Sequence, residues 1–584
     1  MNSVKKEYDF VVIGGGLSGM CCAIAAARRG VKTALLQDRS VLGGNASSEV
    51  RMHVCGADRH GFVPSARETG IIEELLLTNR FYNPQHSFSV QDAIFYDFVK
   101  NEKNLDLYLN TRAISCRAEN NRILSVTAYQ SSSETQFEFF ARFFADNSGD
   151  GAIAAQSGAK YVYGRESKAA YGEPHAPEEA DENVMGNTIM FTAKDTGAPV
   201  PFKKPARAYD FSEDDLRRRD HQQITSGYWW LEVSGKLNTI TQNDEIYDEL
   251  LNVLFGVWDH IKNKPGHNAE NYALDWIGSI AAKRESRRFI GDYVLKETDL
   301  AEAVAFPDAV AYGGWTMDVH VPNGVFAFDQ PATTYYPVKS MYGIPYRSLY
   351  SVNIENLFLG GRLISASHIA FGSTRVMGTC AVIGQAVGTA AAIALENGFS
   401  SAREAGAKID VLQQTLLKND CYIPGVKNTD ETDLARRANV SATSEKQGCE
   451  AANVINGVAR SVGDEANYYE GENGLNDALF LCWDSPVAVK EFSVAFDSDL
   501  SKELTITISD EIRNRQQRFP KRLAKDFTVA FFCRGTLVKE IDVTNNLLRR
   551  RVFTFAPVAA DKIALRVRST HGNEPPRVFE VRVY

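Results

Sequence analysis

The stretch YDFVVIGGGLSG, residues 8–19, decides the fold of the first part of this chain. It opens with Tyr8–Ile13, a short apolar and β-branched run typical of a strand buried on both faces of a parallel sheet. An Ala-rich helix then continues to about Arg29, and Lys32–Leu36 forms a second apolar strand. Strand, helix and strand make a βαβ unit, whose crossover is expected to be right-handed.

Three glycines follow the first strand with the spacing GxGxxG, and each has a separate task. Gly14 allows a tight turn, Gly16 lets the backbone approach a pyrophosphate, and Gly19 lets the helix pack closely on the sheet. The N-terminus of the helix adds free N–H groups and a positive dipole end for the phosphates. Because the motif lies between a strand and a helix in a unit of the right length, it predicts dinucleotide binding rather than a merely structural turn.

The residues after the second strand depart from the usual dinucleotide-binding pattern. Gln37, followed by Asp38, stands where an acidic residue usually holds the ribose hydroxyls. A glutamine amide can accept one hydroxyl hydrogen bond without the charge assistance of a carboxylate, so ribose recognition is expected to be weaker or shared with neighbours. The segment Val41–Ser48 that follows is a small, flexible loop rich in hydroxyl groups.

Further motifs recur along the chain. They include 146–151 (DNSGDG), 283–288 (KRESRR), 344–349 (IPYRSL), 360–362 (GGR) and 372–377 (GSTRVM). With the GxGxxG unit and the Gly-Gly-Asn-Ala-Ser loop, this order over roughly residues 7–420 resembles the FAD-dependent oxidoreductases built on the glutathione-reductase-type flavin domain. In particular, it resembles a bacterial subgroup related to the FAD subunit of heterodisulfide reductase. The chain lacks the cysteine-rich motifs of that subunit, so the resemblance implies FAD without an iron–sulfur centre, and no metal site is expected.

The GxGxxG motif and the resemblance together assign a set of cofactor-binding residues. A helix over Thr379–Glu396 is expected to direct its N-terminal end at the flavin pyrimidine, where its dipole stabilises charge on the reduced ring. The alternative is a buried packing helix of Ala and Gly. The expected cofactor-binding residues are Gly14, Gly16, Leu17, Ser18, Gly19, Gln37, Asp38, Gly43, Gly44, Asn45, Ala46, Ser47, Asp146, Gly149, Asp150, Gly361, Arg362, Gly372, Ser373 and Thr379.

Catalysis by a flavin needs a base near the substrate and donors that fix it. The candidates for these tasks are His320, His368, Arg375 and Arg288. The two histidines lie beside glycines, in segments that the resemblance places near the flavin. Asp318 could orient His320, because residues two apart in an extended segment share a face, or it could be a surface carboxylate.

Arg288 belongs to a basic set with Arg284 and Arg287. The spacing places the three arginines on adjacent turns of an expected helix, where they could hold an anionic substrate. The alternative is that they form ion pairs with Glu285 and Asp292.

Length and composition bound the number and class of the domains. The chain has 584 residues, of which 44% are apolar and 23% are charged, and this composition argues against a disordered or fibrous protein. Its formal net charge of −9 argues against a general polyanion binder. The expected fold class is α/β. An FAD/NAD(P)-binding Rossmann-like domain in two parts, residues 1–160 and 341–425, surrounds an inserted α+β substrate or lid domain at residues 161–340, and a β-sandwich follows at residues 430–584.

Short segments of alternating polarity fill residues 430–584. They indicate strands, without helices, at 490–496, 504–509, 527–533, 537–543, 551–555, 562–568 and 579–584, a spacing typical of a β-sandwich. The opening SATSEKQGCEAANVING, the segment around Trp483 and the closing VFEVRVY resemble the discoidin or coagulation-factor type C jelly roll, a galactose-binding-like fold. Such modules bind sugars in some proteins and only pack against their enzyme in others.

These patterns predict an FAD-dependent oxidoreductase acting on a hydroxyl of a carbohydrate or glycoside. Two alternatives stay open: a fumarate-reductase-like C–C oxidoreductase that holds a carboxylic acid with arginines, and a carbohydrate-binding protein with an inactive flavin domain. No second GxGxxG unit occurs, so no dedicated NAD(P)H domain is expected. Nine scattered cysteines, a polar start and a short apolar stretch at 380–395 favour a cytoplasmic protein with no membrane span and no nucleic-acid partner.

Overall fold

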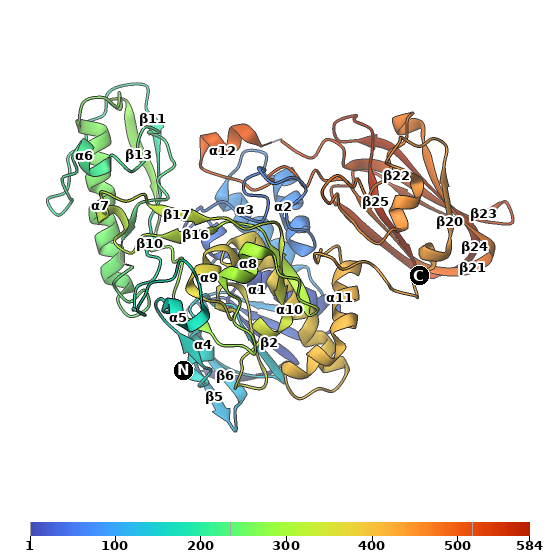
Figure 1. Cartoon of the computed structure of the whole chain (residues 1–584), viewed down its shortest axis with the longest axis horizontal. Coiled ribbons are helices and arrows are strands. Elements are labelled where there is room, and N and C mark those ends of the chain that lie inside the picture. Colours follow the sequence, from blue (N-terminus) through green and yellow to red (C-terminus); the bar gives the residue numbers. More distant parts are fainter. Residues whose placement is uncertain (1, 234, 517) are drawn as a thin grey trace. The chain divides into compact units, whose positions relative to one another are not determined.

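The computed structural model describes residues 2–233, 235–516 and 518–584 and divides into two compact units (Figure 1). Unit 1 consists of Met1–Gly56, His86–Ile409 and Thr505–Arg515, and unit 2 consists of Ala57–Gln85, Asp410–Leu504 and Gln516–Tyr584. Each unit therefore takes in a segment that lies, in sequence, within the other. The sequence does not predict this exchange of Ala57–Gln85 and Thr505–Arg515.

A five-stranded parallel sheet forms the core of unit 1. Its strand order is β19-β8-β2-β3-β4, and all neighbouring strands are parallel. Four of the strands are buried along their whole length, as expected for apolar runs inside a parallel sheet. The predicted βαβ unit is present as β2, α1 and β3. The bounds are β2 (Phe10–Ile13), α1 (Leu17–Arg28), β3 (Thr33–Leu36), β4 (Leu105–Tyr108), β8 (Phe143–Asp146) and β19 (Leu357–Leu359).

Helix α10 (Met377–Glu396) packs on α1 through its glycines. A Cβ at Gly384 would lie 2.0 Å from the Ser18 carbonyl oxygen, and one at Gly388 would lie 2.0 Å from that of Cys22. With 20 residues, the helix is longer than the apolar stretch suggested, and by length and composition alone it could cross a membrane. In the fold, however, 94% of its most apolar window is buried inside the protein.

Unit 1 also contains a second sheet, of order β1-β7-β6-β5, and five two-stranded pairs: β10-β12, β11-β13, β14-β9, β15-β18 and β16-β17. The strand bounds are β1 (Asn2–Glu7), β5 (Thr111–Glu119), β6 (Arg122–Gln130), β7 (Thr135–Phe140), β9 (Tyr161–Val162), β10 (Asn187–Thr188), β11 (Phe191–Asp195), β12 (Glu232–Val233), β13 (Tyr272–Ile277), β14 (Arg288–Phe289), β15 (Ala309–Gly313), β16 (Met317–His320), β17 (Thr333–Tyr336) and β18 (Tyr342–Pro345).

A separate apolar core gathers around helix α7 (Asn243–Asn263), which lies beside β11 and β13 in Figure 1. It includes Phe191, Trp230 and Trp258. These residues fall within 161–340, where a substrate or lid domain was expected from the sequence, and that assignment stays a prediction. The other α-helices of unit 1 are α3 (Phe88–Lys100), α4 (Ala152–Gln156), α5 (Lys168–Tyr171), α6 (Glu213–Leu216), α8 (Glu297–Glu302), α9 (His368–Thr374) and α12 (Asp510–Arg515).

Unit 2 is built on a sheet of order β20-β21-β24-β22-β23, in which β25 also pairs with β21. All of these pairings are antiparallel, and the sheet-rich character predicted for residues 430–584 is confirmed. The bounds are β20 (Asn439–Ala442), β21 (Ala478–Phe496), β22 (Ala524–Cys533), β23 (Thr536–Val543), β24 (Arg550–Thr570) and β25 (Val578–Val583), with helices α2 (Ile71–Tyr82) and α11 (Ile409–Lys418).

Three details of the predicted strands are wrong. Residues 504–509 are not a strand: Thr505 accepts the N–H of Val54 with its hydroxyl at 2.9 Å, and Ile508 packs beside Val50. Their alternating polarity reflects contacts within unit 1 rather than the sheet of unit 2. The segments 551–555 and 562–568 are one continuous strand, β24, and the region contains a short helix, α12.

One buried arginine ties the segment Ala57–Gln85 to the rest of unit 2. The Arg67 guanidinium donates to both carboxylate oxygens of Glu73, at 2.8 and 3.1 Å. It also donates to the carbonyl oxygens of Ser498, at 3.0 Å, and Asp499, at 2.7 Å. Because a buried ion pair is costly to break, these contacts fix α2 in this unit.

A pH-dependent effect on stability is expected from Asp58, a buried carboxyl group in the same segment. Burial, and then the neighbouring Glu503, raises the pKa of Asp58 to about 6. The folded protein therefore holds this proton more tightly than the unfolded chain, and stability is lost as the pH rises from about 4 to about 6. We expect Asp58→Asn to raise the free energy of unfolding by about 1–3 kcal/mol at about pH 7.5 and to have little effect near pH 4.

Urea unfolding at both pH values measures this difference. Asp484→Asn, at an exposed aspartate, is the matched control and should change stability at neither pH. An equal gain for Asp58→Asn at both pH values would contradict the assignment of the effect to ionisation.

Candidate functional site

The predicted cofactor motifs meet at one edge of the parallel sheet in unit 1. Residues 14–16 follow β2, residue 37 follows β3, residues 147–151 follow β8, and residues 360–362 follow β19. Because these strands are neighbours and run in the same direction, all four segments leave the sheet at its carboxyl edge. Ligands of open α/β sheets bind at this edge.

The glycine turn after β2 combines tight packing with free space. A Cβ at Gly14, whose φ is 98°, would lie 2.4 Å from the Asn147 carbonyl oxygen, and a Cβ at Gly19 would lie 1.8 Å from the carbonyl oxygen of Gly14. In contrast, a Cβ at Gly16 would meet nothing nearer than the Cα of Gly44, at 4.0 Å. Gly16 is also the N-cap of α1 and supplies no side-chain cap, which leaves this helix terminus open to an anion.

The side-chain amide of Gln37 supports the glycine turn. Its Oε1 accepts the N–H of Gly15 at 2.8 Å, and its Nε2 donates to the Val41 carbonyl at 2.9 Å. The residue is only 4% exposed, whereas Asp38 beside it is exposed. The N–H of Gly43 donates to the carbonyl of Gly15 at 2.9 Å, so the second loop also lies against the turn.

Lys283 joins three of the predicted motifs. Its carbonyl accepts Nδ2 of Asn45 at 3.1 Å and Nη1 of Arg362 at 2.6 Å, and its Nζ donates to Asp150 at 2.6 Å. Burial alone would raise the pKa of Asp150, but Lys283 and Arg362 outweigh it and hold that pKa below its usual range. Asp146, by contrast, uses its oxygens on hydroxyl and N–H groups of its own turn and of α4, which is a structural role.

The other predicted residues of these loops lie close to the same edge. Leu17 and Ser18 open α1, and the Ser18 hydroxyl donates to Oδ1 of Asn147 at 2.7 Å. A Cβ at Gly149 would lie 2.4 Å from the Arg362 guanidinium. The remaining residues of the set here are Gly44, Ala46 and Ser47, in or next to the single turn Gly44–Ala46, and Gly361, whose φ is 62°.

A second group of charged side chains surrounds His320 in β16. Nδ1 of His320 lies 2.7 Å from Oε2 of Glu232, and its Nε2 lies 3.4 Å from Oδ1 of Asp318. Asp318 also accepts Nη2 of Arg375 at 3.1 Å, and Glu232 lies 3.3 Å from Nη1 of Arg284. Asp318 and His320 thus share one face of β16, as their spacing suggests.

Both carboxylates of the His320 group are held in the charged form. Burial alone would raise the pKa of Asp318 and of Glu232, but the cations beside them outweigh it. His320 and Arg375 lower the pKa of Asp318, and Arg284 and His320 lower that of Glu232. Nε of Arg375 has no hydrogen-bond partner among the described residues, and this arginine is within electrostatic range of the arginine of the GGR motif. The His320 group therefore lies near the cofactor motifs, and it contains one N–H donor, Nε of Arg375, without a partner among the described residues.

His368 and Arg288 belong to a different group, around the buried Glu285. Nδ1 of His368 lies 3.0 Å from Oε1 of Glu285. The Arg288 guanidinium pairs with Glu285, donates to Glu166 at 2.6 Å and donates through Nε to the Ala366 carbonyl at 3.1 Å. Arg288 is 0% exposed, so its bonding is that of a structural ion pair and not of a substrate clamp.

The expected helix carrying the three arginines is wrong. Residues 284–287 are not helical, and Arg288 opens the short strand β14. Arg284 turns toward Glu232, and Arg287 lies over the ring of Tyr161, 5.1 Å from its centroid. Because each of the three guanidinium groups has a different partner, they do not form one anion-binding set.

We expect Arg288→Met to destabilise unit 1 by about 3–5 kcal/mol, because the change leaves Glu285 and Glu166 buried without their cation. Arg287→Met is the matched control, since this partly exposed neighbour loses a ring contact with Tyr161 and one hydrogen bond to the Asp150 carbonyl at 3.2 Å, but no ion pair with a buried carboxylate. Thermal unfolding of both variants measures the difference. Equal melting temperatures would show that Arg288 has no such structural role.

The last predicted residues lie around α9 and the start of α10. The hydroxyl of Ser373 is 2.6 Å from that of Tyr342 and also donates to a main-chain carbonyl, so it is committed to the fold. A Cβ at Gly372 would lie 3.0 Å from the backbone N of Asp318, which brings α9 against β16. Thr379 lies in the first turn of α10, where the neighbouring Gly378 donates its N–H to the Cys55 carbonyl at 2.8 Å.

Sequence reasoning missed two residues that hold this site together. Glu232 is the direct partner of His320, yet it lies in the apolar segment WWLEV, where no local pattern marks it. Lys283 contacts three loops. A sequence pattern could have identified it, because Lys283 is the first residue of the KRESRR motif.

Comparison with known proteins gives one match over most of the chain and several over parts of it. The model of the family described as FAD dependent oxidoreductase matches residues 9–416. Glycerol-3-phosphate dehydrogenase of Mycobacterium leprae (strain TN) and glycerol-3-phosphate dehydrogenase 2 of Mycobacterium tuberculosis (strain ATCC 25618 / H37Rv) are each 45% identical over 47 residues, which is 8% of this chain and 8% of each relative.

Solved structures are similar to a smaller part of the chain. The lectin domain of lectinolysin complexed with Lewis B antigen is 15% identical, with 27% of this chain and 98% of that chain covered and a TM-score of 0.21. The family 32 CBM from C. perfringens NanJ in complex with galactose is 18% identical, with 26% and 97% covered and a TM-score of 0.20.

Proposed function

We propose that this chain, which belongs to the family of FAD dependent oxidoreductases, oxidises a hydroxyl group of a carbohydrate or glycoside. The observation that carries the proposal is the setting of His320. Its Nδ1 is bonded to Glu232 at 2.7 Å, while its Nε2 faces Asp318 at 3.4 Å. An imidazole oriented by one carboxylate, with a second one at its other nitrogen, is suited to take a proton and to be stabilised once it has done so.

The residues at the carboxyl edge of the sheet fit FAD. The space beside Gly16 and the uncapped N-terminus of α1 suit the pyrophosphate. The exposed carboxylate of Asp38 is two residues beyond the end of β3, close to where a ribose is held in this type of fold. Lys283 and Arg362 add positive charge at the loops after β8 and β19.

The chain's own residues account for the movement of the proton. Bound FAD would supply the two-electron acceptor for the hydride of the hydroxyl-bearing carbon. Nδ1 of His320 is bonded to Glu232, so Nε2 is the nitrogen left to exchange a proton with the substrate hydroxyl. Asp318, paired with Arg375, stabilises the imidazolium that results.

Two features support a polyhydroxylated substrate. Carboxylates, an imidazole and a guanidinium around His320 are the donors and acceptors that bind sugar hydroxyls. The C-terminal sequence also resembles galactose-binding-like modules. The carboxylic-acid alternative has less support, because Arg288, one of its candidate clamps, is already bound by Glu285 and Glu166.

Anaerobic mixing of the purified flavoprotein with a panel of sugars and glycosides tests this function. We expect at least one compound to bleach the oxidised flavin and to gain a carbonyl group, as detected by mass spectrometry. Dicarboxylates with a reduced dye form the parallel panel for the alternative reaction. Bleaching by no sugar or glycoside, together with turnover of a dicarboxylate, would overturn the proposal. A colourless protein that still binds glycans would instead favour a binding function.

A further inference from the structure

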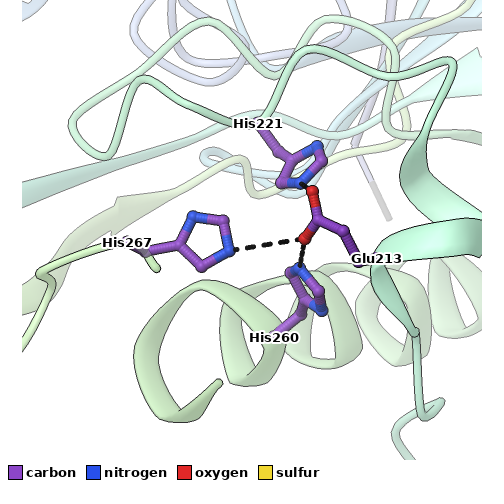
Figure 2. A group of neighbouring side chains, drawn as sticks. All are labelled: Glu213, His221, His260 and His267. Atoms are coloured by element: carbon purple, nitrogen blue, oxygen red, sulfur yellow. Dashed lines mark hydrogen bonds and ion pairs between the residues drawn. The ribbon is translucent and has the colours of Figure 1, made fainter. Parts of the chain in front are cut away.

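Four side chains that the flavin site does not use converge at the end of helix α7 (Figure 2). Glu213 opens α6, His221 follows that helix, His260 lies in the last turn of α7, and His267 lies in the loop after it. Each offers one possible ligand atom, and these four atoms all lie within 4.8 Å of one another. No local pattern predicts a metal centre here, because the four residues come from two separate stretches of the chain.

The backbone fixes the tautomers of two of these histidines. Nδ1 of His221 lies 2.6 Å from the Arg219 carbonyl oxygen, and Nδ1 of His260 lies 3.0 Å from the Phe211 carbonyl oxygen. A carbonyl oxygen only accepts, so each Nδ1 carries a hydrogen and each neutral ring is left with a lone pair on Nε2. Metal-binding histidines are usually held in this way by a second bond on the other nitrogen.

The free lone pairs face a carboxylate. Nε2 of His221 lies 3.2 Å from Oε1 of Glu213, and Nε2 of His260 lies 3.0 Å from its Oε2. Two neutral nitrogens and a carboxylate are all acceptors, so their approach requires either protons or a cation among them. If each Nε2 carried a proton, the result would be two imidazolium rings with their centroids 5.3 Å apart. The mutual repulsion of the two charges opposes this arrangement.

His267 completes the group and is otherwise unsatisfied. Its side chain is 3% exposed, and neither ring nitrogen has a hydrogen-bond partner within the part of the chain that the structure describes. Its Nε2 lies 3.9 Å from Oε2 of Glu213.

We propose that Glu213, His221, His260 and His267 bind one Zn²⁺ ion as a structural site. Three imidazole nitrogens and one carboxylate oxygen are a ligand set that zinc accepts in tetrahedral geometry. Ligands about 2.0–2.1 Å from the ion lie roughly 3.3 Å apart. Oε2 of Glu213 lies 3.0 Å from Nε2 of His260 and 3.9 Å from Nε2 of His267, and one ligand atom from each of the four residues lies within 4.8 Å of the others. The ion would tie α6 and its following loop to the end of α7.

Metal analysis of the full-length protein, with its flavin bound, tests the proposal. After purification with added ZnSO₄ and extensive dialysis, we expect about one zinc per chain by mass spectrometry, and Co²⁺ in its place should give the intense visible bands of a tetrahedral site. His267→Gln should weaken zinc binding about 10²-fold or more. Loss of a residue that only hydrogen-bonds to a metal ligand already costs about 10–100-fold in metal affinity, and loss of a ligand itself costs more. This variant removes a ring that lacks other bonds, so the fold is least disturbed.

Two controls separate metal loss from misfolding. The flavin absorbance of His267→Gln should match that of the parent protein, and His571→Gln, whose ring is bonded to the Asn546 carbonyl at 2.7 Å, should keep its zinc. Chelation of zinc from the parent protein should lower its melting temperature, and added zinc should restore it. Less than one-tenth of an equivalent of zinc in the parent protein, or unchanged zinc affinity in His267→Gln, would overturn the proposal.

Discussion

In the variant His320→Gln, reduction of the bound flavin by the substrate is expected to be about 10²–10⁴-fold slower, the usual contribution of a positioned acid–base group. Glutamine can still donate to Glu232 but has no basic nitrogen opposite Asp318. The flavin content should be unchanged, because the glycine turn lies in other segments. Stopped-flow absorbance under anaerobic conditions measures the rate, using the sugar or glycoside that bleaches the parent protein.

The pH profile distinguishes a proton acceptor from a merely structural histidine. In the parent protein the rate of flavin reduction should depend on pH, and the limb that reports the base should be absent in His320→Gln. His175→Gln is the matched control, because that ring is 44% exposed and pairs with Glu297, which is not a member of the His320 group. A rate for His320→Gln within threefold of the parent, with the same pH limb, would refute the assignment of the base.

The variant Gly16→Ala is expected to fold normally and to lose FAD. Its φ of −68° suits alanine, and the added Cβ would meet the protein only at 4.0 Å, but it would fill the space in front of the helix N-terminus. We expect the dissociation constant of FAD to rise about 10²-fold, which corresponds to about 2.7 kcal/mol. The ratio of flavin to protein absorbance after dialysis measures the loss, and circular dichroism reports the fold.

Alanine at the nearby Gly19 is expected to affect the fold as well as the flavin. In Gly19→Ala the Cβ would lie 1.8 Å from the Gly14 carbonyl oxygen, so this variant is expected to lose stability as well as flavin. Gly406→Ala, whose Cβ would make only ordinary contacts of 3.6 Å with Tyr346, should keep both. Full flavin content in Gly16→Ala would contradict the placement of the pyrophosphate.

Local patterns made the cofactor edge predictable. The glycine turn depends on residues within one βαβ unit, where steric limits on a few φ values and one helix N-terminus decide which residues can occur. The later loops were found because they resemble a family, and their assembly at one edge follows from the parallel order of the strands. The bonding of Gln37 to the turn was not foreseen, because it depends on the rotamer of one side chain.

Contacts between distant segments could not be predicted in the same way. Glu232 meets His320 across 88 residues of sequence, and nothing in either stretch specifies the other. Alternating polarity at 504–509 indicated a strand with one buried face, but residues 504–507 are all buried, the polar ones included, so the alternation did not mark such a face. Arg288 was marked correctly as unusual, but charge spacing alone does not reveal whether a guanidinium meets a substrate or a buried carboxylate.

The bond between Arg67 and Ser498 has a consequence for how the protein is made. The two residues are 431 positions apart. At about 5–20 residues per second, a ribosome needs roughly 20–90 s after making the first to deliver the second. Throughout that interval the nascent chain carries Ile71–Tyr82, with its apolar residues, before its partners exist. The second unit therefore cannot be completed before the segment around Ser498 has been made, and we expect chaperones to protect this early helix during that interval.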